Sequence, residues 1–148
     1  MPSHSEQRAL PYPPERLFDL VADVERYPDF LPWCVASRIL SRTETDLRAE
    51  LAIGFKGIRE RFVSHVTLDR PDLRIDVTYE DGPFKFLENH WKFEDRGEAG
   101  CLLDFYVDFE FKSRLLDMLI GPLFDDAVRR MVQAFEDRAA ALHDTAPS

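Results

Sequence analysis

Hydrophobic and polar residues alternate along most of the central part of the chain, which predicts β-strands with one buried face. The clearest segment runs from Cys101 to Phe111, where every second residue is apolar and Asp104 and Asp108 lie on the other parity. The alternation begins at Val35 and continues through residues 47–55, 58–68, 73–79 and 84–93. Turn-forming residues separate these segments at 55–57, 69–72, 81–83 and 96–100. Short turns between successive strands predict an antiparallel meander.

The N-terminal part is expected to add a short strand and two short helices. Residues 5–12 are interpreted as the strand, which the following prolines stop. Pro14 suits the first turn of a helix because its missing N–H costs nothing there. Asp23 is expected to cap a second short helix over residues 24–27, which Pro28 ends.

After Ser113 the apolar residues recur at the spacing of a helix. Gly121 and Pro122 interrupt the pattern, so we expect a helical turn, a kink and then a helix from about Pro122 to Leu142. That helix would span roughly 30 Å, enough to cross a sheet. Its expected apolar face consists of Leu116, Leu119, Leu123, Ala127, Met131, Phe135 and Leu142, widened by Phe124, Val128, Val132 and Ala139. The acidic face, with Asp125, Asp126, Glu136 and Asp137, is expected to be solvated surface.

Composition and charge narrow the functional classes. A length of 148 residues fits a single domain over residues 1–148, with an ordered core at about 5–142. A net charge of −9 argues against direct binding to DNA or RNA. Cys34 and Cys101 stand far apart and indicate buried thiols in a reducing compartment, with no metal site or disulfide. The start of the chain predicts no signal peptide, so we expect a cytoplasmic protein.

The phenylalanine content suggests an apolar cavity. The chain has 12 Phe, and one helix about 10 Å wide cannot fill the concave side of a six- or seven-stranded sheet. Large side chains or a ligand must therefore occupy the remaining space. The Phe residues on the inward parity of their strands are Phe55, Phe62, Phe93, Phe105, Phe109 and Phe111.

Three runs of sequence carry a family resemblance: VADVERYPDFLPWC, GPFKFLENHWKF and CLLDFYVDFEFKSRLL. With their spacing they resemble the START-like (helix-grip, SRPBCC) superfamily, within it the group of coenzyme Q-binding proteins and the ribosome association toxin RatA. The resemblance implies an α+β fold in which a curved antiparallel sheet of six to seven strands wraps around a long C-terminal helix. Two short helices follow the first strand in this fold.

The resemblance also implies a function. A member of the coenzyme Q-binding group is expected to bind and shield an apolar lipid such as ubiquinone, held as a ligand and not as a redox cofactor. This would support respiratory electron transport, with respiratory chain components at the membrane surface as partners and transient membrane association. The alternative is a RatA-like protein that binds the ribosome and inhibits translation through subunit association. A third alternative is a polyketide cyclase-like enzyme, although we expect no enzymatic activity.

The predicted ligand cavity combines the inward strand positions with the C-terminal helix. Its expected lining is Leu51, Ile53, Phe55, Phe62, Ser64, Asn89, Trp91, Phe93, Phe105, Val107, Phe109, Leu119, Leu123 and Met131. The entrance is expected at Phe30, Leu31, Trp33 and Pro122, as a lid or membrane-touching tip; alternatively, the loop side chains close the end of the core.

A few polar residues share the inward parity and are candidates for holding a head group. Asn89 or Lys85 can donate to a quinone carbonyl, with Ser64 nearby. Alternatively, Lys85 and Glu60 lie near the rim, reach water and pair with each other.

Catalytic interpretations have less support. Glu60 is the one inward carboxylate that would serve a cyclase, because Asp104 and Asp108 lie on the wet parity. His65 and His90 also fall on outward parities, and no nucleophile, metal or phosphate motif is present in the sequence.

Overall fold

The computed structural model describes the backbone of residues 3–31, 34–55 and 57–145. Side chains are described for these residues except 55, 58, 124, 125 and 143–145. Seven strands of this described part form one antiparallel sheet in the order β1-β7-β6-β5-β4-β3-β2. They are β1 (Ser3–Leu10), β2 (Cys34–Arg42), β3 (Asp46–Phe55), β4 (Ile58–Asp69), β5 (Arg74–Asp81), β6 (Phe84–Asp95) and β7 (Cys101–Phe111).

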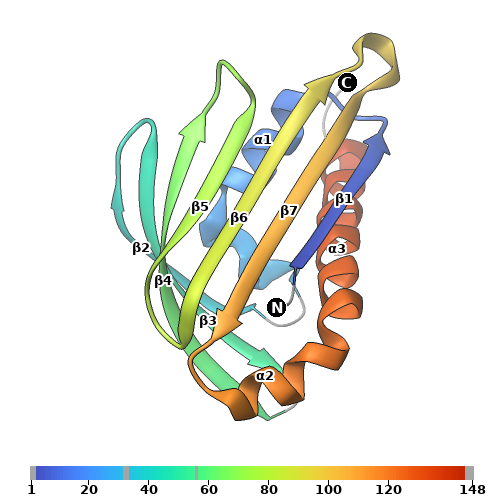
Figure 1. Cartoon of the computed structure of the whole chain (residues 1–148). Helices are drawn as coiled ribbons and strands as arrows, with labels where there is room; N and C mark the ends of the chain where they lie inside the picture. Colours follow the sequence, from blue (N-terminus) through green and yellow to red (C-terminus); the bar gives the residue numbers. More distant parts are fainter. Residues whose placement is uncertain (1–2, 32–33, 56, 146–148) are drawn as a thin grey trace.

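The helices lie on the concave side of this sheet (Figure 1). They are α1 (Pro14–Ala22), α2 (Arg114–Ile120) and α3 (Phe124–Thr145), with the 3-10 turns η1 (Val24–Asp29) and η3 (Gly121–Leu123) next to them in the chain. A further 3-10 turn, η2 (Gly97–Ala99), lies between β6 and β7. Helix α3 runs along the sheet from α2 at one end of the molecule to the opposite end (Figure 1). The predicted α+β helix-grip architecture, with two short helices after the first strand, is confirmed.

The strand register places inward side chains in rows across the sheet. Phe105 lies opposite Trp91, which lies opposite Ile75 on β5. Two residues further along the same strands, Val107 lies opposite Asn89. Because side chains alternate between the two faces, these rows form the floor on which the helices pack.

Large aromatic residues fill the space under α1 and α3. Phe18 of α1 meets Phe93 edge-on at 6.2 Å between ring centroids. Trp91 contacts Phe105 at 4.6 Å and Phe135 of α3 at 5.0 Å, both in tilted or edge-on geometry. Such offset and edge-on pairs are the favoured arrangements of aromatic rings, so this part of the interior is closely packed.

Two local predictions near the N-terminus were wrong. The side chain of Asp23 makes no capping hydrogen bond, and the second short helix is a 3-10 turn that includes Pro28 instead of ending before it. Pro28 fits there because it is the second residue of a turn that closes when the N–H of Phe30 donates to the carbonyl oxygen of Tyr27 at 3.3 Å, and that position needs no N–H partner. Pro14 does occupy the first turn of α1 as predicted.

The C-terminal helix also differs from its predicted phase. Helix α3 begins at Phe124, since the 3-10 turn η3 takes up Gly121–Leu123. A 3-10 turn has fewer residues per turn than an α-helix. The turn η3 therefore changes the direction in which the side chains of α2 point, compared with one continuous α-helix through α2 and α3. Leu119 is consequently 50% exposed, although the unbroken pattern placed it on the buried face. Leu142, in the last turns of α3, is 44% exposed.

Gly100, between η2 and β7, is required by a close approach of two chain segments. It has φ +105°, and a Cβ there would lie 2.1 Å from the carbonyl oxygen of Leu10. Nearby, Gly97 has φ +61° and open space around the position of a Cβ. We predict that Gly100→Ala lowers the free energy of unfolding by at least about 3 kcal/mol, whereas Gly97→Ala costs about 1 kcal/mol. Urea unfolding of both variants checks this, and equal losses would contradict it.

Candidate ligand cavity

A cavity of about 240 Å³ lies between the concave face of the sheet and the helices. Strands β3 to β7 form its floor, and residues of α1, η1, α2 and α3 complete its wall. The predicted residues that line it are Leu51, Ile53, Phe62, Ser64, Asn89, Trp91, Phe105, Val107, Phe109 and Met131. Lining residues outside the predicted set include Tyr27, Cys34, Val66, Ile75, Val77, Phe84, Leu87, Ile120, Ala127, Val128 and Phe135. Val66, Ile75 and Val77 were not predicted, although strand parity could have identified them, because they lie on the same face of the sheet as predicted lining residues.

Some predicted lining residues lie elsewhere. Phe93 is fully buried against Phe18 and belongs to the packed core under α1. Leu119 points to solvent from α2, and Leu123 is half-buried in η3 away from the cavity wall. Parity alone cannot separate a packed region from a hollow one, which explains Phe93. The side chain of Phe55 lies outside the described part of the structure.

The predicted entrance residues are divided between several environments. Leu31 lines the cavity. Phe30 packs edge-on against Tyr27 and Phe135, with ring centroids 6.0 and 5.1 Å away. Pro122 is exposed in η3, and Trp33 lies outside the described residues. Phe30 and Leu31 thus pack against the core and the cavity wall, and an entrance at this loop stays a prediction.

Most polar groups on the cavity wall already have protein partners. The hydroxyl of Tyr27 donates to the carbonyl oxygen of Val21, and burial raises the pKa of Tyr27 far above its ordinary value. Trp91 Nε1 donates to Asn89 Oδ1 at 2.7 Å, and Asn89 Nδ2 donates to the carbonyl oxygen of Tyr106 at 2.9 Å. An amide has two N–H groups and two oxygen lone pairs, so Asn89 retains one of each.

Ser64 differs from these groups. It is 2% exposed, it lines the cavity, and among the described residues no hydrogen bond joins its hydroxyl to another protein atom. It lies opposite Tyr79 on β5 and Ala49 on β3, near the middle of the concave face. Because this hydroxyl faces the cavity without a protein partner, it is a strong candidate for a ligand contact.

Lys85 and Glu60, the other predicted inward polar residues, do not reach the cavity wall. A register irregularity between Phe84 and Phe86 on β6 turns Lys85 outward, where its Nζ lies 3.9 Å from Glu110 Oε1. Glu60 is half-buried near the beginning of β4. The predicted pairing of Lys85 with Glu60 was therefore wrong, because the bulge reverses the parity at one position.

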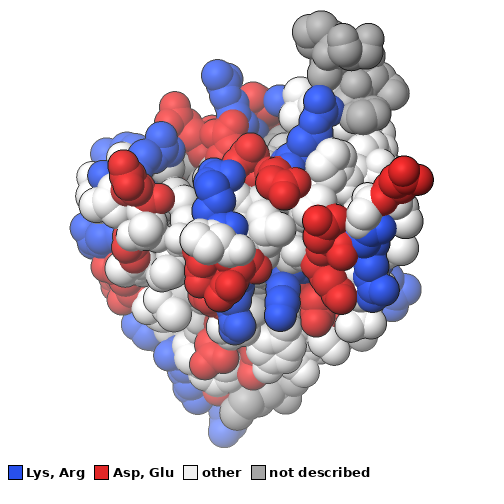
Figure 2. All heavy atoms as spheres, turned by 90° about the horizontal axis from the view of Figure 1, so that it is seen from above, with Lys and Arg blue, Asp and Glu red and all other residues white. Residues whose placement is uncertain are grey.

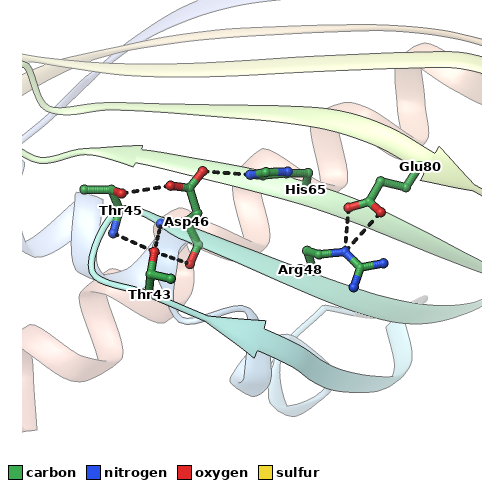
Figure 3. A network of polar contacts seen from close by, with 6 residues as sticks. All are labelled: Thr43, Thr45, Asp46, Arg48, His65 and Glu80. Carbon is green, nitrogen blue, oxygen red and sulfur yellow. Dashed lines mark hydrogen bonds and ion pairs between the residues drawn. The ribbon is translucent and has the colours of Figure 1, made fainter.

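The histidines of the central strands lie on the outer face of the sheet, as predicted. His65 Nε2 lies 2.7 Å from Asp46 Oδ1, beside the Arg48–Glu80 ion pair at 2.9 Å (Figure 3). The hydrogen bond to His65 lowers the pKa of Asp46. His90 Nδ1 lies 2.6 Å from Oδ1 of Asp76 on β5. These pairs face away from the cavity and take no part in its chemistry.

Among the residues that the structure describes, none on the lining carries a group that is ionised near neutral pH. Burial raises the pKa of Cys34 to about 11, so its thiol stays protonated. Within the described ranges, no group of three or more His, Cys, Asp or Glu residues is arranged to hold a metal ion. The same ranges contain no helix long and apolar enough to span a bilayer. The wall therefore suits a neutral, mainly apolar ligand with a small polar part.

Comparisons with known proteins agree with this geometry. The model of a family described as "Polyketide cyclase / dehydrase and lipid transport" matches residues 10–136. Ribosome association toxin RatA of Pseudomonas aeruginosa is 41% identical, covering 97% of this chain and 99% of the relative. Coenzyme Q-binding protein COQ10 homolog B, mitochondrial, of Xenopus laevis is 40% identical, over 95% of this chain but 59% of the relative.

Solved structures support the fold. A START superfamily protein from Mycobacterium smegmatis superposes with a TM-score of 0.81 at 21% identity, covering 95% of this chain and 98% of the other. The START-like resemblance inferred from the three sequence runs is therefore confirmed.

The free hydroxyl of Ser64 leads to a prediction about stability. Ser64→Ala should raise the free energy of unfolding of the ligand-free protein by about 1 kcal/mol, because it removes an unpaired buried polar group. The matched control is Ser37→Ala, since Ser37 Oγ donates to the carbonyl oxygen of Val24 at 2.9 Å. Loss of that bond should cost about 1 kcal/mol. Urea unfolding of both variants measures the difference, and a loss in Ser64→Ala as large as that in Ser37→Ala would refute it.

Proposed function

This chain belongs to the polyketide cyclase, dehydrase and lipid transport family, and we propose that it binds one apolar molecule of the isoprenoid quinone class, such as ubiquinone, and shields it from water. The observation that carries the proposal is the apolar cavity with one unpaired buried hydroxyl, at Ser64, on its wall. The coenzyme Q-binding relative at 40% identity supports a quinone as the ligand.

The size of the cavity indicates which part of such a ligand it encloses. An apolar cavity of about 150 Å³ is known to hold benzene. At about 240 Å³ the cavity has room for a substituted ring with a short stretch of tail, and not for a long isoprenoid tail. The rest of the tail must follow the cavity wall outward or lie in a membrane. Covering apolar area stabilises the complex by roughly 25 cal/mol per Å² removed from water.

Two groups on the wall suit a quinone ring. Ser64 has a hydroxyl that can donate to a carbonyl oxygen, and Asn89 retains one N–H. The two positions are separated by two strand spacings and by one row of inward residues along the strands, which corresponds to roughly 12 Å between backbones. A quinone ring carries carbonyl oxygens on opposite sides. One oxygen can accept a hydrogen bond from Ser64 or Asn89, and the other oxygen then points toward the second of these two residues. The hydroxyl also accepts, so the reduced quinol can be held as well.

The protonation states of the wall favour binding over catalysis. A cyclase needs a general base near its substrate, with a pKa close to the working pH. The titratable groups on the described wall are Tyr27 and Cys34, and burial raises the pKa of both. We therefore propose a non-enzymatic role in respiratory electron transport, with ubiquinone as cargo.

A second candidate function is association with the ribosome, as the name of the RatA relative indicates. It is favoured by end-to-end similarity, because this chain covers 99% of the Pseudomonas protein and 59% of the COQ10 homologue. A net charge of −9 opposes direct contact with ribosomal RNA, so such binding would proceed through basic ribosomal proteins.

Quinone binding can be measured in a Trp33→Phe background, where Trp91 on the cavity wall is the remaining tryptophan. A short-chain ubiquinone should quench Trp91 fluorescence and raise the melting temperature.

Ala127→Phe, which fills part of the cavity, should weaken quinone binding at least about tenfold. Ser64→Ala should weaken it about fivefold, the equivalent of one hydrogen bond. The control is Ala141→Phe, at an exposed position of the same helix, which should bind normally. Absence of both quenching and thermal shift at saturating quinone would refute the proposal.

Ribosome association has a separate test. If the second candidate function holds, the protein should co-sediment with ribosomal subunits in moderate salt, and Ala127→Phe should co-sediment equally because its change is internal. A protein that remains at the top of the gradient at every salt concentration would eliminate this function. If Ala127→Phe loses both ribosome and quinone binding, the two activities share the cavity.

A further inference from the structure

Helix α2 exposes an apolar patch, which we define as Leu115, Met118 and Leu119. These side chains are 63%, 74% and 50% exposed. They account for three of the six large hydrophobic residues exposed in the described part of the chain, within five residues of sequence. Positions 115, 118 and 119 share one face of a helix, so they form one continuous surface. Clustered exposed apolar side chains of this kind mark an interaction site.

The opposite face of the same helix belongs to the cavity. Ile120 lines the cavity, and Leu116 packs against the buried core. Asp117 Oδ1 accepts a hydrogen bond from the backbone N–H of Phe111 at 3.1 Å, and Ser113 Oγ caps the helix through Leu116 N at 3.3 Å. Helix α2 is therefore apolar on both sides, and one helical layer separates the cavity from the patch.

The charges beside the patch are positive. Lys112 and Arg114 are exposed, and within the described residues neither has an ion-pair partner. The carboxylate of Asp117 accepts the backbone N–H of Phe111 and keeps its negative charge, so Lys112, Arg114 and Asp117 together give residues 112–120 a net charge of +1. The opposite end of the molecule differs, because acidic and basic side chains alternate across it (Figure 2). In a protein of net charge −9, the segment that carries α2 thus has a small net positive charge.

An apolar patch with cations at its edge matches the interface of a bilayer that contains anionic lipids. Three side chains supply far less area than the roughly 800 Å² per partner of a stable protein interface. The net negative charge acts weakly at contact, because charges beyond about 8 Å are screened at physiological salt. Lys112 and Arg114 lie within that distance of a surface that α2 touches.

We propose that α2 docks this protein on an anionic lipid bilayer, with the patch inserted below the headgroups and Lys112 and Arg114 among them. The cavity wall at Ile120 then lies one helix away from the acyl chains. This docking goes beyond quinone binding and does not depend on it, because empty vesicles provide every contact that the patch needs.

The test is flotation of the purified full chain with quinone-free vesicles of phosphatidylethanolamine and phosphatidylglycerol. The wild-type protein should float, and Leu115→Glu/Met118→Glu should lose at least about tenfold in partitioning. The matched control is Leu142→Glu, which also removes an exposed apolar side chain but near the far end of α3. It should float like wild type. Lys112→Glu/Arg114→Glu should weaken binding to anionic vesicles more than to neutral phosphatidylcholine vesicles.

Several outcomes overturn the proposal. They are a wild-type protein that does not float, a patch variant that floats as well as wild type, or a Leu142→Glu variant that loses binding equally. A wild-type protein that is dimeric by sedimentation, with a monomeric patch variant, would assign the patch to self-association instead. Quenching of Trp91 by short-chain ubiquinone in solution reports the cavity separately, so loss of docking and loss of quinone binding are distinguishable. Circular dichroism and the melting temperature establish that each variant is folded.

Discussion

The structure depends on covering a seven-stranded curved sheet with one long helix. Seven strands spaced about 4.8 Å apart are roughly 30 Å wide, whereas a helix with its side chains is about 10 Å wide. Helix α3 can therefore cover the length of the concave face but not its width. Helix α1 and Phe18 fill the region over Phe93, and Phe135 fills the region over Trp91. Between these contacts and α2 the helices cannot reach every part of the sheet, and the cavity of about 240 Å³ remains there.

Aromatic contacts make the cavity wall stiff on the side of β6 and β7. Phe84 lies 5.4 Å from Phe62, 5.5 Å from Tyr79 and 4.8 Å from Phe111, measured between ring centroids. Its backbone N–H donates to the hydroxyl of Tyr79 at 3.2 Å, so that hydroxyl has a partner and the bulge of β6 is held in place. Rings locked in this way cannot collapse into the empty space, which keeps the cavity open in the absence of a ligand. The more adaptable wall is α2, whose main contacts are with the end of β7 and with η3.

Sequence periodicity was sufficient for the fold because each strand has one buried and one solvated face. It was also sufficient for much of the cavity, including Ser64, Asn89 and Phe105, since inward parity brings these residues to the same surface. Two local features could not be predicted in this way. The bulge before Phe86 reverses parity at Lys85, and the 3-10 turn at Gly121–Leu123 shifts the helical phase, so that Ile120 and not Leu119 faces the cavity. Parity also gives no measure of packing density, which is why Phe93 was assigned to the cavity instead of the core.

The free energy of ligand transfer explains why a single polar group matters in this cavity. An apolar molecule that moves from a bilayer into an apolar cavity exchanges one water-free environment for another, so the hydrophobic effect contributes little to the exchange. The difference must come from groups that are satisfied only in the complex. The Ser64 hydroxyl is such a group, since it has no protein partner in the described structure and gains a hydrogen bond of about 1 kcal/mol from a carbonyl-bearing head group. The same hydroxyl gives no advantage to a pure hydrocarbon. Selection of a lipid with a small polar head over the surrounding acyl chains therefore rests on Ser64 and on the remaining N–H of Asn89, while the apolar wall prevents loss of the ligand to water.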